Sequence, residues 1–362
     1  MTTPLETRIR RLIATTGPLP VSDYMAMCLF DPQDGYYTTR EPFGADGDFV
    51  TAPEISQMFG EIVAAWLVHA WRLLGRPAPF ALVEMGPGRG TLMRDILRTA
   101  RVDPAFRAAA KTCLVETSGR LRAVQRETLG ADAAECAWLE DLSALPALPL
   151  LFVANELFDA VPVRQIVKTP NGWCERLVGL HDEDGLAFVA GPPLAERSVL
   201  PAGADSQPDG AVFEYAPARE AIATQLGAHL AAQGGAALLI DYGHARSGFA
   251  DTLQAVRDHR PVSVFETPGA ADLTSHVDFE ALAGAARASG ASAHPVATQG
   301  AFLLALGLAE RAGALGHAKD EKTQAEIRAA AERLAGTRDG EMGDLFKVLC
   351  LTGAPMALPP FA

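Results

Sequence analysis

An acidic residue and three alternating glycines follow one another within a short stretch of the chain. They are Glu84, Gly86, Gly88 and Gly90. Residues 80–83 before them are apolar like a buried strand, and residues 91–98 after them have helical spacing. A strand, a tight glycine turn and a helix in this order are typical of a site for a nucleoside-containing cofactor. Glycine spacing alone is a weak signal, so an ordinary glycine-rich turn remains an alternative.

The glycine spacing also distinguishes between two classes of cofactor. A dinucleotide site has the pattern G-x-G-x-x-G/A, and Thr91 stands here where the last glycine or alanine belongs. S-adenosylmethionine has no pyrophosphate to rest on a helix N-terminus, but it has an α-ammonium that the Glu84 carboxylate could bind. The spacing therefore favours S-adenosylmethionine over NAD, and a methyltransferase over a dehydrogenase.

Other polar residues stand at the ends of further apolar runs. Ligands bind beyond the carboxyl ends of strands in open α/β sheets, so Glu116, Asn155, Glu156 and Asp241 are candidates beside Glu84. We expect Glu116 to accept hydrogen bonds from both ribose hydroxyls. It lies farther from the glycines than the usual distance of about 20 residues, which the connector at 103–111 explains.

Asp141 and Leu142 follow Trp138 and are predicted to cover the adenine, with Asp141 accepting a hydrogen bond from its exocyclic amine. The alternative for Asp141 is a helix cap or a loop aspartate.

The segment 154–162 is predicted to be the catalytic element. Methyl transfer is an in-line displacement from an activated sulfonium, so the protein mainly supplies positioning and electrostatics. The carboxylates of Glu156 and Asp159, with Asn155 beside them, could orient a guanidinium and receive its proton. Alternatively, Asn155 and Glu156 bind the cofactor while Asp159 caps a turn. His244 and His276 are possible bases, although a lone histidine is more often structural.

The elements that position these residues alternate between strands and helices. Apolar runs at 81–84, 112–116, 150–154 and 236–241 suit parallel strands that are covered on both faces, and helices are expected at 91–99, 119–129 and 216–233. A last strand at 345–351 would pair antiparallel with one near 294–298. The predicted fold class is α/β: a doubly wound, Rossmann-like class I methyltransferase sheet with an antiparallel last strand.

Two domains are expected. Residues 1–76 would form an N-terminal helical cap with a loop at 30–54, which is either functional or a surface connector. Residues 77–362 would form the methyltransferase core. Two insertions interrupt it: a small antiparallel sheet at about 163–215, with turns at 171–172 and 183–185, and a loop and helix at about 244–290.

Composition narrows the class of protein further. Among 362 residues, 49% are hydrophobic and 21% are charged, as in globular proteins, and the net charge is −13. This charge disfavours broad nucleic-acid or anionic-membrane binding and suits a basic protein substrate. Five scattered cysteines predict reduced thiols and no metal site. With no apolar leader or membrane span in the sequence, we expect a cytoplasmic protein without membrane insertion.

Taken together, these motifs resemble the MidA family, which includes mitochondrial complex I assembly factors. The resemblance runs nearly end to end and is carried by residues 31–32, 35–37, 47–54, 59–61, 84–93, 114–116, 154–156, 159–162, 241–243, 271–274, 276–279, 342–343 and 346–348. It adds Thr51, in the motif 47–54, to the expected cofactor-binding residues. Phe158 departs from the aliphatic residue usual in the family at that position.

The resemblance implies a class I fold that uses S-adenosyl-L-methionine, with an N-terminal cap and insertions that form the acceptor site. It also implies protein arginine methylation, with a respiratory complex I subunit as the acceptor in the family's mitochondrial members. A non-catalytic assembly chaperone that retains the fold is the alternative function. The acceptor, the methylation pattern and the oligomeric state are left open at this point.

Overall fold

A computed structural model describes residues 3–39, 50–181 and 185–361. Its contacts divide the chain into two compact units, and each contains segments that are distant in sequence. The first unit comprises Met1–Phe49, Phe158–Arg219 and Arg246–Asp278, and the second comprises Val50–Leu157, Glu220–Ala245 and Phe279–Ala362. The division at residue 76 expected from the sequence stays a prediction, while these contacts group residues 50–76 with the second unit.

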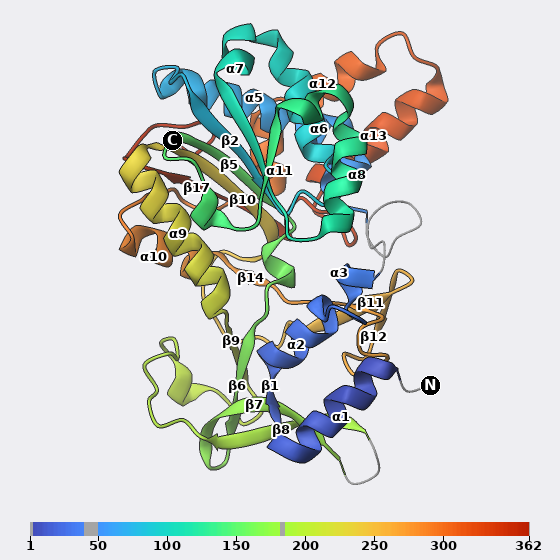
Figure 1. Cartoon of the computed structure of the whole chain (residues 1–362), viewed down its shortest axis with the longest axis vertical. Helices are drawn as coiled ribbons and strands as arrows, with labels where there is room; N and C mark the ends of the chain where they lie inside the picture. Colours follow the sequence, from blue (N-terminus) through green and yellow to red (C-terminus); the bar gives the residue numbers. More distant parts are fainter. Residues whose placement is uncertain (1–2, 40–49, 182–184, 362) are drawn as a thin grey trace. The chain divides into compact units, whose positions relative to one another are not determined.

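The second unit is built on a long sheet with the strand order β15-β17-β10-β5-β2-β3-β4 (Figure 1). Their bounds are β2 Phe80–Met85, β3 Ala110–Val115, β4 Cys136–Leu139, β5 Leu150–Asn155, β10 Gly235–His244, β15 Ser292–Ala293 and β17 Phe346–Thr352. The neighbours from β4 to β10 are parallel, whereas β17 runs antiparallel to β10 and to β15. β16 (Ala297–Thr298) also pairs antiparallel with β17. The sheet therefore has the class I methyltransferase order with a reversed strand inserted near one edge.

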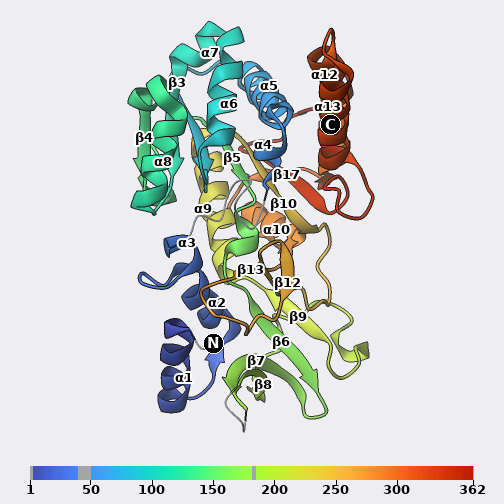
Figure 2. The same cartoon turned by 90° about the vertical axis from the view of Figure 1, so that its right-hand side faces the viewer.

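The helices of the second unit form because their apolar residues recur at helical spacing, and several of them begin at a side-chain cap. They are α4 Ala52–Ile55, α5 Gln57–Leu73, α6 Thr91–Thr99, α7 Pro104–Ala109, α8 Gly119–Leu129, α10 Phe279–Ala288, α11 Gln299–Ala305, α12 Leu308–Gly316 and α13 Glu321–Ala335. The side chain of Ser118 caps α8 and that of Asp320 caps α13. Figure 2 shows α12 and α13 side by side. α9 (Pro217–Gln233) begins in the first unit and continues in the second.

Large apolar side chains hold α5 and α7 against the start of β2. Trp66 and Trp71 of α5 are almost completely buried, and Trp71 lies 6.1 Å from the ring of Phe80 at the start of β2. Phe106 of α7 completes the cluster at 4.9 Å from Phe80. Such aromatic contacts bury large apolar areas. They anchor the start of β2, whose other end leads into the glycine turn.

The first unit contains two antiparallel sheets. One has the order β1-β7-β6-β9, with β8 also paired to β7, and the other has the order β12-β11-β13. The bounds are β1 Leu19–Pro20, β6 Arg164–Thr169, β7 Gly172–Leu180, β8 Leu186–Pro193, β9 Val212–Tyr215, β11 Gln254–Arg257, β12 Arg260–Val262 and β13 Asp272–Thr274. Helices α1 (Pro4–Thr16) and α2 (Val21–Phe30) pack on β7 (Figure 1).

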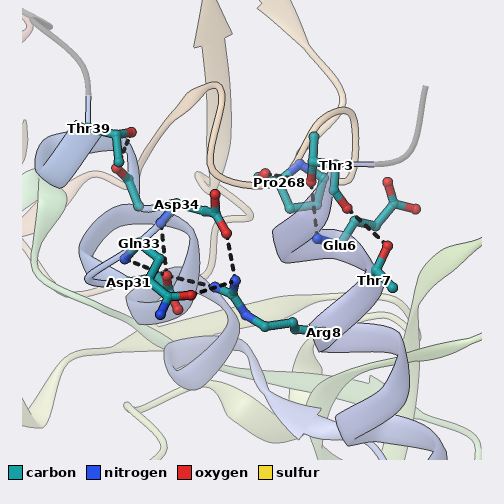
Figure 3. Close-up of polar contacts among 10 residues, drawn as sticks. Thr3, Glu6, Thr7, Arg8, Asp31, Gln33, Asp34, Thr39 and Pro268 are labelled. Atoms are coloured by element: carbon teal, nitrogen blue, oxygen red, sulfur yellow. Dashed lines mark hydrogen bonds and ion pairs between the residues drawn. The ribbon is translucent and has the colours of Figure 1, made fainter.

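A charged turn follows α2 and explains part of the motif 31–37. Asp31 accepts hydrogen bonds from the backbone N–H groups of Gln33 and Asp34, each at 2.9 Å, and pairs with Arg8 of α1 at 2.6 Å (Figure 3). Gly35 closes the turn, and a Cβ there would lie 2.4 Å from the nitrogen of Asp31. These residues shape a turn that joins α1, α2 and α3 (Tyr36–Thr39).

The expected elements are largely confirmed. The four apolar runs are β2, β3, β5 and β10, and the helix expected at 119–129 is α8. The strands within 163–215 and the reversed last strand are also present. The stretch 244–290 differs, because it carries β11, β12 and β13 before α10. The loop at 40–49 and most of the turn at 183–185 lie outside the described residues. In the described part of the chain, no helix combines the length and apolar character needed to cross a membrane.

Candidate functional site

Four neighbouring strands bring the predicted polar residues to one edge of the long sheet. The order β3-β2-β5-β10 places Glu116, Glu84, Asn155 and Asp241 near the carboxyl ends of adjacent strands. The register pairs Met85 with both Val115 and Ala154, and Asn155 with Ile240. Adjacent strands lie about 4.8 Å apart, so neighbouring residues of this row can contact one ligand.

The turn after β2 is made of glycines that other residues could not replace without strain. Gly86, Gly88 and Gly90 have φ angles of 68°, 50° and 83°, all in the left-handed region. A Cβ on Gly86 would lie 2.6 Å from Cδ1 of Leu157. α6 begins directly after the turn at Thr91. The turn therefore brings bare backbone to the edge of the sheet, where a ligand can approach closely.

Glu84 lies at the bottom of this edge and is 3% exposed. The backbone N–H of Met93 donates a hydrogen bond to its carboxyl group, but Oε2 has no hydrogen-bond partner among the described residues. Burial raises the pKa of Glu84 to about 8. An unpaired buried oxygen is costly, so Glu84 offers an acceptor that a ligand ammonium would satisfy.

Glu116, one strand away, is held firmly. One of its oxygens accepts a hydrogen bond from the backbone N–H of Ser118 at 2.8 Å, and the other accepts one from Nε2 of Gln125 at 3.1 Å. Burial raises its pKa, and these hydrogen bonds act in the opposite direction. Gln125 is not among the site residues predicted from the sequence. It stands between Leu121 and Leu129 at a spacing of four residues, so a polar residue in the apolar stripe of α8 was the signal.

The turn after β5 presents Asn155 and Glu156. Glu156 is a non-glycine residue with a φ of 50°, and its N–H donates to the carbonyl of Ile240 at 2.9 Å. The following N–H, of Leu157, donates to Oδ2 of the fully buried Asp241 at 3.1 Å. A residue held in this region costs about 1–3 kcal/mol and persists where neighbouring contacts enforce it. Such strain is concentrated at functional sites.

The Glu156 side chain is also held by neighbours in the second unit. Its Oε1 accepts hydrogen bonds from the N–H of Ala52 at 2.8 Å and from Nδ2 of Asn155 at 3.0 Å. Oδ1 of the buried Asn155 has no partner in the described part of the chain. Thr51, directly before Ala52, is the N-cap residue of α4 and is half-buried. The structure thus brings the motif containing Thr51 next to the turn after β5.

The remaining predicted residues lie in other surroundings. Asp141 is exposed and caps the short 3-10 helix Leu142–Ala144, where its Oδ1 accepts from the N–H of Ser143 at 2.7 Å. The hydrogen bonds from the side chain and backbone of Ser143 lower the pKa of Asp141. Leu142 is buried. The capping interaction is the alternative that the sequence left open, and it leaves a role of Asp141 toward adenine as a prediction.

Asp159 belongs to the first unit and is 7% exposed in the short 3-10 helix Phe158–Ala160. Its backbone carbonyl accepts a hydrogen bond from the buried guanidinium of Arg219 at 3.1 Å. Nearby, the hydroxyl of Tyr37 donates to Asp272 at 3.0 Å. Burial raises the pKa of Tyr37 well above its ordinary value, and the charges of Asp272 and Asp159 add to this effect.

The residues of the second unit fit S-adenosylmethionine. The buried oxygens of Glu84 and Asn155 that lack partners can accept hydrogen bonds from an ammonium, and Glu116 can accept from ribose hydroxyls. The glycine turn beside them presents backbone without side chains, because Gly86, Gly88 and Gly90 all have positive φ angles. The bound cofactor would supply the sulfonium methyl group, and the protein would orient it.

Comparisons with known proteins identify methyltransferases as relatives of this chain. The family model described as "Putative S-adenosyl-L-methionine-dependent methyltransferase" matches residues 62–297. The protein arginine methyltransferase NDUFAF7 homolog of Drosophila melanogaster, named as mitochondrial, is 36% identical over 377 residues, covering 96% of this chain and 84% of its own. Human NDUFAF7, also named a mitochondrial protein arginine methyltransferase, is 36% identical over 335 residues, covering 84% and 74% of the two chains.

A solved structure from Burkholderia thailandensis is also similar. That protein, described as a "likely methyl transferase", was crystallised with S-adenosyl-homocysteine. It is 32% identical, has a TM-score of 0.84, and covers 99% of this chain and 94% of its own. The expected cofactor and class I fold are therefore confirmed. This chain belongs to the family of S-adenosyl-L-methionine-dependent methyltransferases that also contains the NDUFAF7 proteins, the MidA family that its motifs resemble.

Proposed function

We propose that this methyltransferase transfers the methyl group of S-adenosylmethionine to the guanidinium of an arginine in a protein acceptor. The observation that carries the proposal is the 36% identity, across 96% of the chain, to a protein named as a protein arginine methyltransferase. The net charge of −13 also suits a basic acceptor segment. A respiratory-complex subunit is the first acceptor to test, because the family resemblance suggests it.

In the proposed reaction, Glu84 and Asn155 bind the amino-acid end of the cofactor and Glu116 binds the ribose. The glycine turn lies along the cofactor, with Thr51 and Leu142 lining its site and Asp141 serving the adenine. The unpaired buried oxygens of Glu84 and Asn155 support the first assignment. These interactions would fix the sulfonium in one orientation before the acceptor arrives.

Glu156 is the proposed catalytic carboxylate, assisted by Asn155 and Asp159. A guanidinium nitrogen attacks the methyl carbon, the bond from sulfur to that carbon breaks, and sulfur keeps the electron pair as a thioether. The nitrogen proton passes to the carboxylate of Glu156 and then to water. The strained backbone of Glu156 and the two hydrogen bonds to its Oε1 support this role, because they hold the carboxylate in one orientation.

The purified protein, a cell extract and methyl-labelled S-adenosylmethionine provide the test. Peptide mass spectrometry should find label on arginine with the wild-type protein and none with Gly88→Val, whose side chain would intrude on the glycine turn. Label on another residue type would contradict arginine as the acceptor. Absence of label from all peptides, with intact cofactor binding, would favour the assembly chaperone. The mitochondrial location in the relatives' names describes those proteins, and a cytoplasmic location for this chain stays a prediction.

A further inference from the structure

Gln125 is a completely buried amide in a helix face that is otherwise apolar. It lies on α8 between the buried Leu121 and Leu129, four residues from each. A leucine at this position would extend the apolar stripe without any polar group to satisfy. A buried amide must instead find partners for its two donors and its acceptor.

Gln125 finds a partner for each of these polar functions. Nε2 donates to the carbonyl of Gly88 at 2.8 Å and to Oε2 of Glu116 at 3.1 Å. Oε1 accepts from Nε1 of Trp138 at 2.8 Å. The carbonyl and the carboxylate can only accept, and the indole can only donate, so these partners fix which way the amide points. The residue therefore has one orientation.

The three partners come from three different elements of the second unit. Gly88 belongs to the glycine turn after β2, Glu116 directly follows β3, and Trp138 lies in β4. Trp138 is held from another side by Arg126, whose guanidinium lies 4.3 Å from the ring centroid. The Gln125 side chain thus connects the glycine turn after β2, the carboxylate of Glu116 after β3 and the indole of Trp138 in β4.

The consequence for Glu116 is a fixed carboxylate plane. The backbone N–H of Ser118 holds Oε1 and Gln125 holds Oε2, so neither oxygen can rotate away. The backbone N–H of Thr117 also donates to this carboxylate. A carboxylate has about four acceptor sites, so Glu116 can still accept from a ligand hydroxyl. The Glu116 carboxylate is therefore presented to a ribose in one orientation.

We propose that Gln125 is a positioning residue for the cofactor, which aligns the Glu116 carboxylate with the ribose hydroxyls and ties it to the glycine turn and Trp138. The proposal rests on the assignment of Glu116 to the ribose in the proposed function. It assigns a role to a residue of α8 that would have no direct contact with the reacting atoms.

Calorimetric binding of two ligands tests the proposal. The probes are S-adenosylhomocysteine and its 2′,3′-dideoxy analogue, measured with the wild-type protein, Gln125→Leu and the control Glu127→Gln. Glu127 is exposed on the same helix. We expect the wild type and the control to prefer S-adenosylhomocysteine by about 10- to 100-fold, because its hydroxyls bind a charged group. In Gln125→Leu this preference should fall below about 3-fold.

The preference ratio separates a positioning role from a purely structural one. A general loss of stability would weaken both ligands and leave their ratio unchanged, and that result with Gln125→Leu would overturn the proposal. Equal binding of both ligands by the wild type would instead refute the assignment of Glu116 to the ribose. The two failures are therefore distinguishable.

A second variant keeps the test valid if Gln125→Leu does not fold. Gln125→Glu has the same size, and its carboxyl can donate to Glu116 only while it is protonated. We expect its preference for S-adenosylhomocysteine to decline from pH 6 to pH 9 by at least about 5-fold more than that of the wild type. A preference that changes with pH as in the wild type would overturn the proposal.

Discussion

Glu156 combines two features that single residues seldom share, a left-handed backbone and a side chain held by two hydrogen bonds. Its φ is 50°, and its Oε1 accepts from Ala52 and Asn155. The N–H groups of Glu156 and Leu157 are both held by β10, through Ile240 and Asp241. The position of this carboxylate therefore depends on its neighbours, and its charge can be removed without changing its size.

Glu156→Gln should lower kcat for methyl transfer by about 10²- to 10⁴-fold, because the amide cannot receive the proton of the guanidinium. Binding of S-adenosylhomocysteine should change by less than about 3-fold, since the amide oxygen can still accept from the N–H of Ala52. Single-turnover kinetics and calorimetry measure the two quantities. Glu127→Gln, on an exposed position, is the matched control. Unchanged kcat would remove Glu156 from the catalytic step.

The raised pKa of Glu84 leads us to expect that the protein releases a proton when the cofactor binds. Burial raises its pKa to about 8, so at pH 7 the carboxyl group of the free protein is mostly protonated. A bound ammonium favours the carboxylate and lowers that pKa. Affinity for S-adenosylhomocysteine should therefore rise from pH 6 to pH 8 and then level off.

Calorimetry at pH 7 in buffers of different ionisation enthalpy counts the released protons. We expect a release in the wild type and a clearly smaller one in Glu84→Gln. The same raised pKa has a consequence for folding. The free protein should lose stability as the pH rises from about 4.5 through about 8, because the buried carboxylate must then ionise. Proton uptake when the wild-type protein binds S-adenosylhomocysteine would contradict the assignment of Glu84 to the cofactor ammonium.

Among single residues, those at the end of an apolar run could be located from the sequence more easily than a residue that only contacts other site residues. Glu84, Glu116 and Asn155 each end an apolar run, so their places at one edge of the sheet could be predicted, while their roles toward a ligand stay predictions. Gln125 could be found only from the pattern of α8, and its partners Gly88 and Trp138 lie 37 and 13 positions away in sequence. Such contacts depend on how strands and helices pack together, which the sequence pattern does not state.

The glycine turn between β2 and α6 makes a prediction at the scale of elements. Gly86→Ala places a methyl group 2.6 Å from Cδ1 of Leu157 in a backbone with φ 68°. Affinity for S-adenosylhomocysteine should fall at least about 10-fold, because the turn must move away from Leu157 and out of the left-handed region, where a non-glycine residue costs about 1–3 kcal/mol. Adding Leu157→Ala to this variant should restore only part of the affinity, because the strain in the backbone remains.

Gly119, at the first position of α8, is the matched control for this substitution. A Cβ there meets nothing within 4 Å, and the residue already lies in a helix. Gly119→Ala should keep the affinity and raise the free energy of unfolding by up to about 1 kcal/mol. Urea denaturation and calorimetry check both expectations. If Gly86→Ala and Gly119→Ala bound S-adenosylhomocysteine with equal affinity, the prediction that the ligand lies close to the glycine turn would be wrong.

Elements were predictable where their apolar pattern was long. The runs of β5 and β10 are almost wholly buried, and α8 was predicted with its observed bounds. The four residues of β4 are only partly buried, and no strand was predicted there. β11 and β12 have exposed polar residues, so the part of 244–290 before the predicted helix was interpreted as a loop. Short strands of this kind form because a neighbour accepts their hydrogen bonds, which local residue types do not reveal.

The whole molecule carries a net charge of −13. We expect this charge to affect the binding of the acceptor peptide more than the binding of the cofactor. The negative charge would attract a basic acceptor peptide. Salt weakens this attraction, because charges farther apart than the Debye length, about 8 Å at physiological ionic strength, are largely screened. The KM for a basic arginine peptide should therefore rise at least about 5-fold between 20 and 300 mM salt, while the KM for S-adenosylmethionine changes less than about 2-fold. Steady-state kinetics at several salt concentrations measure both. Equal salt dependence of the two constants would argue against charge as a determinant of acceptor choice.

A crystal structure of the protein with S-adenosylhomocysteine tests the central claim most directly, because it shows which residues touch the ligand. We predict that the ligand ammonium lies within hydrogen-bond distance of the unpaired oxygens of Glu84 or Asn155, and that both ribose hydroxyls donate to Glu116. The backbone of the glycine turn should lie against the ligand. A ligand bound elsewhere, or one whose ammonium and ribose contact none of these three residues, would contradict the account.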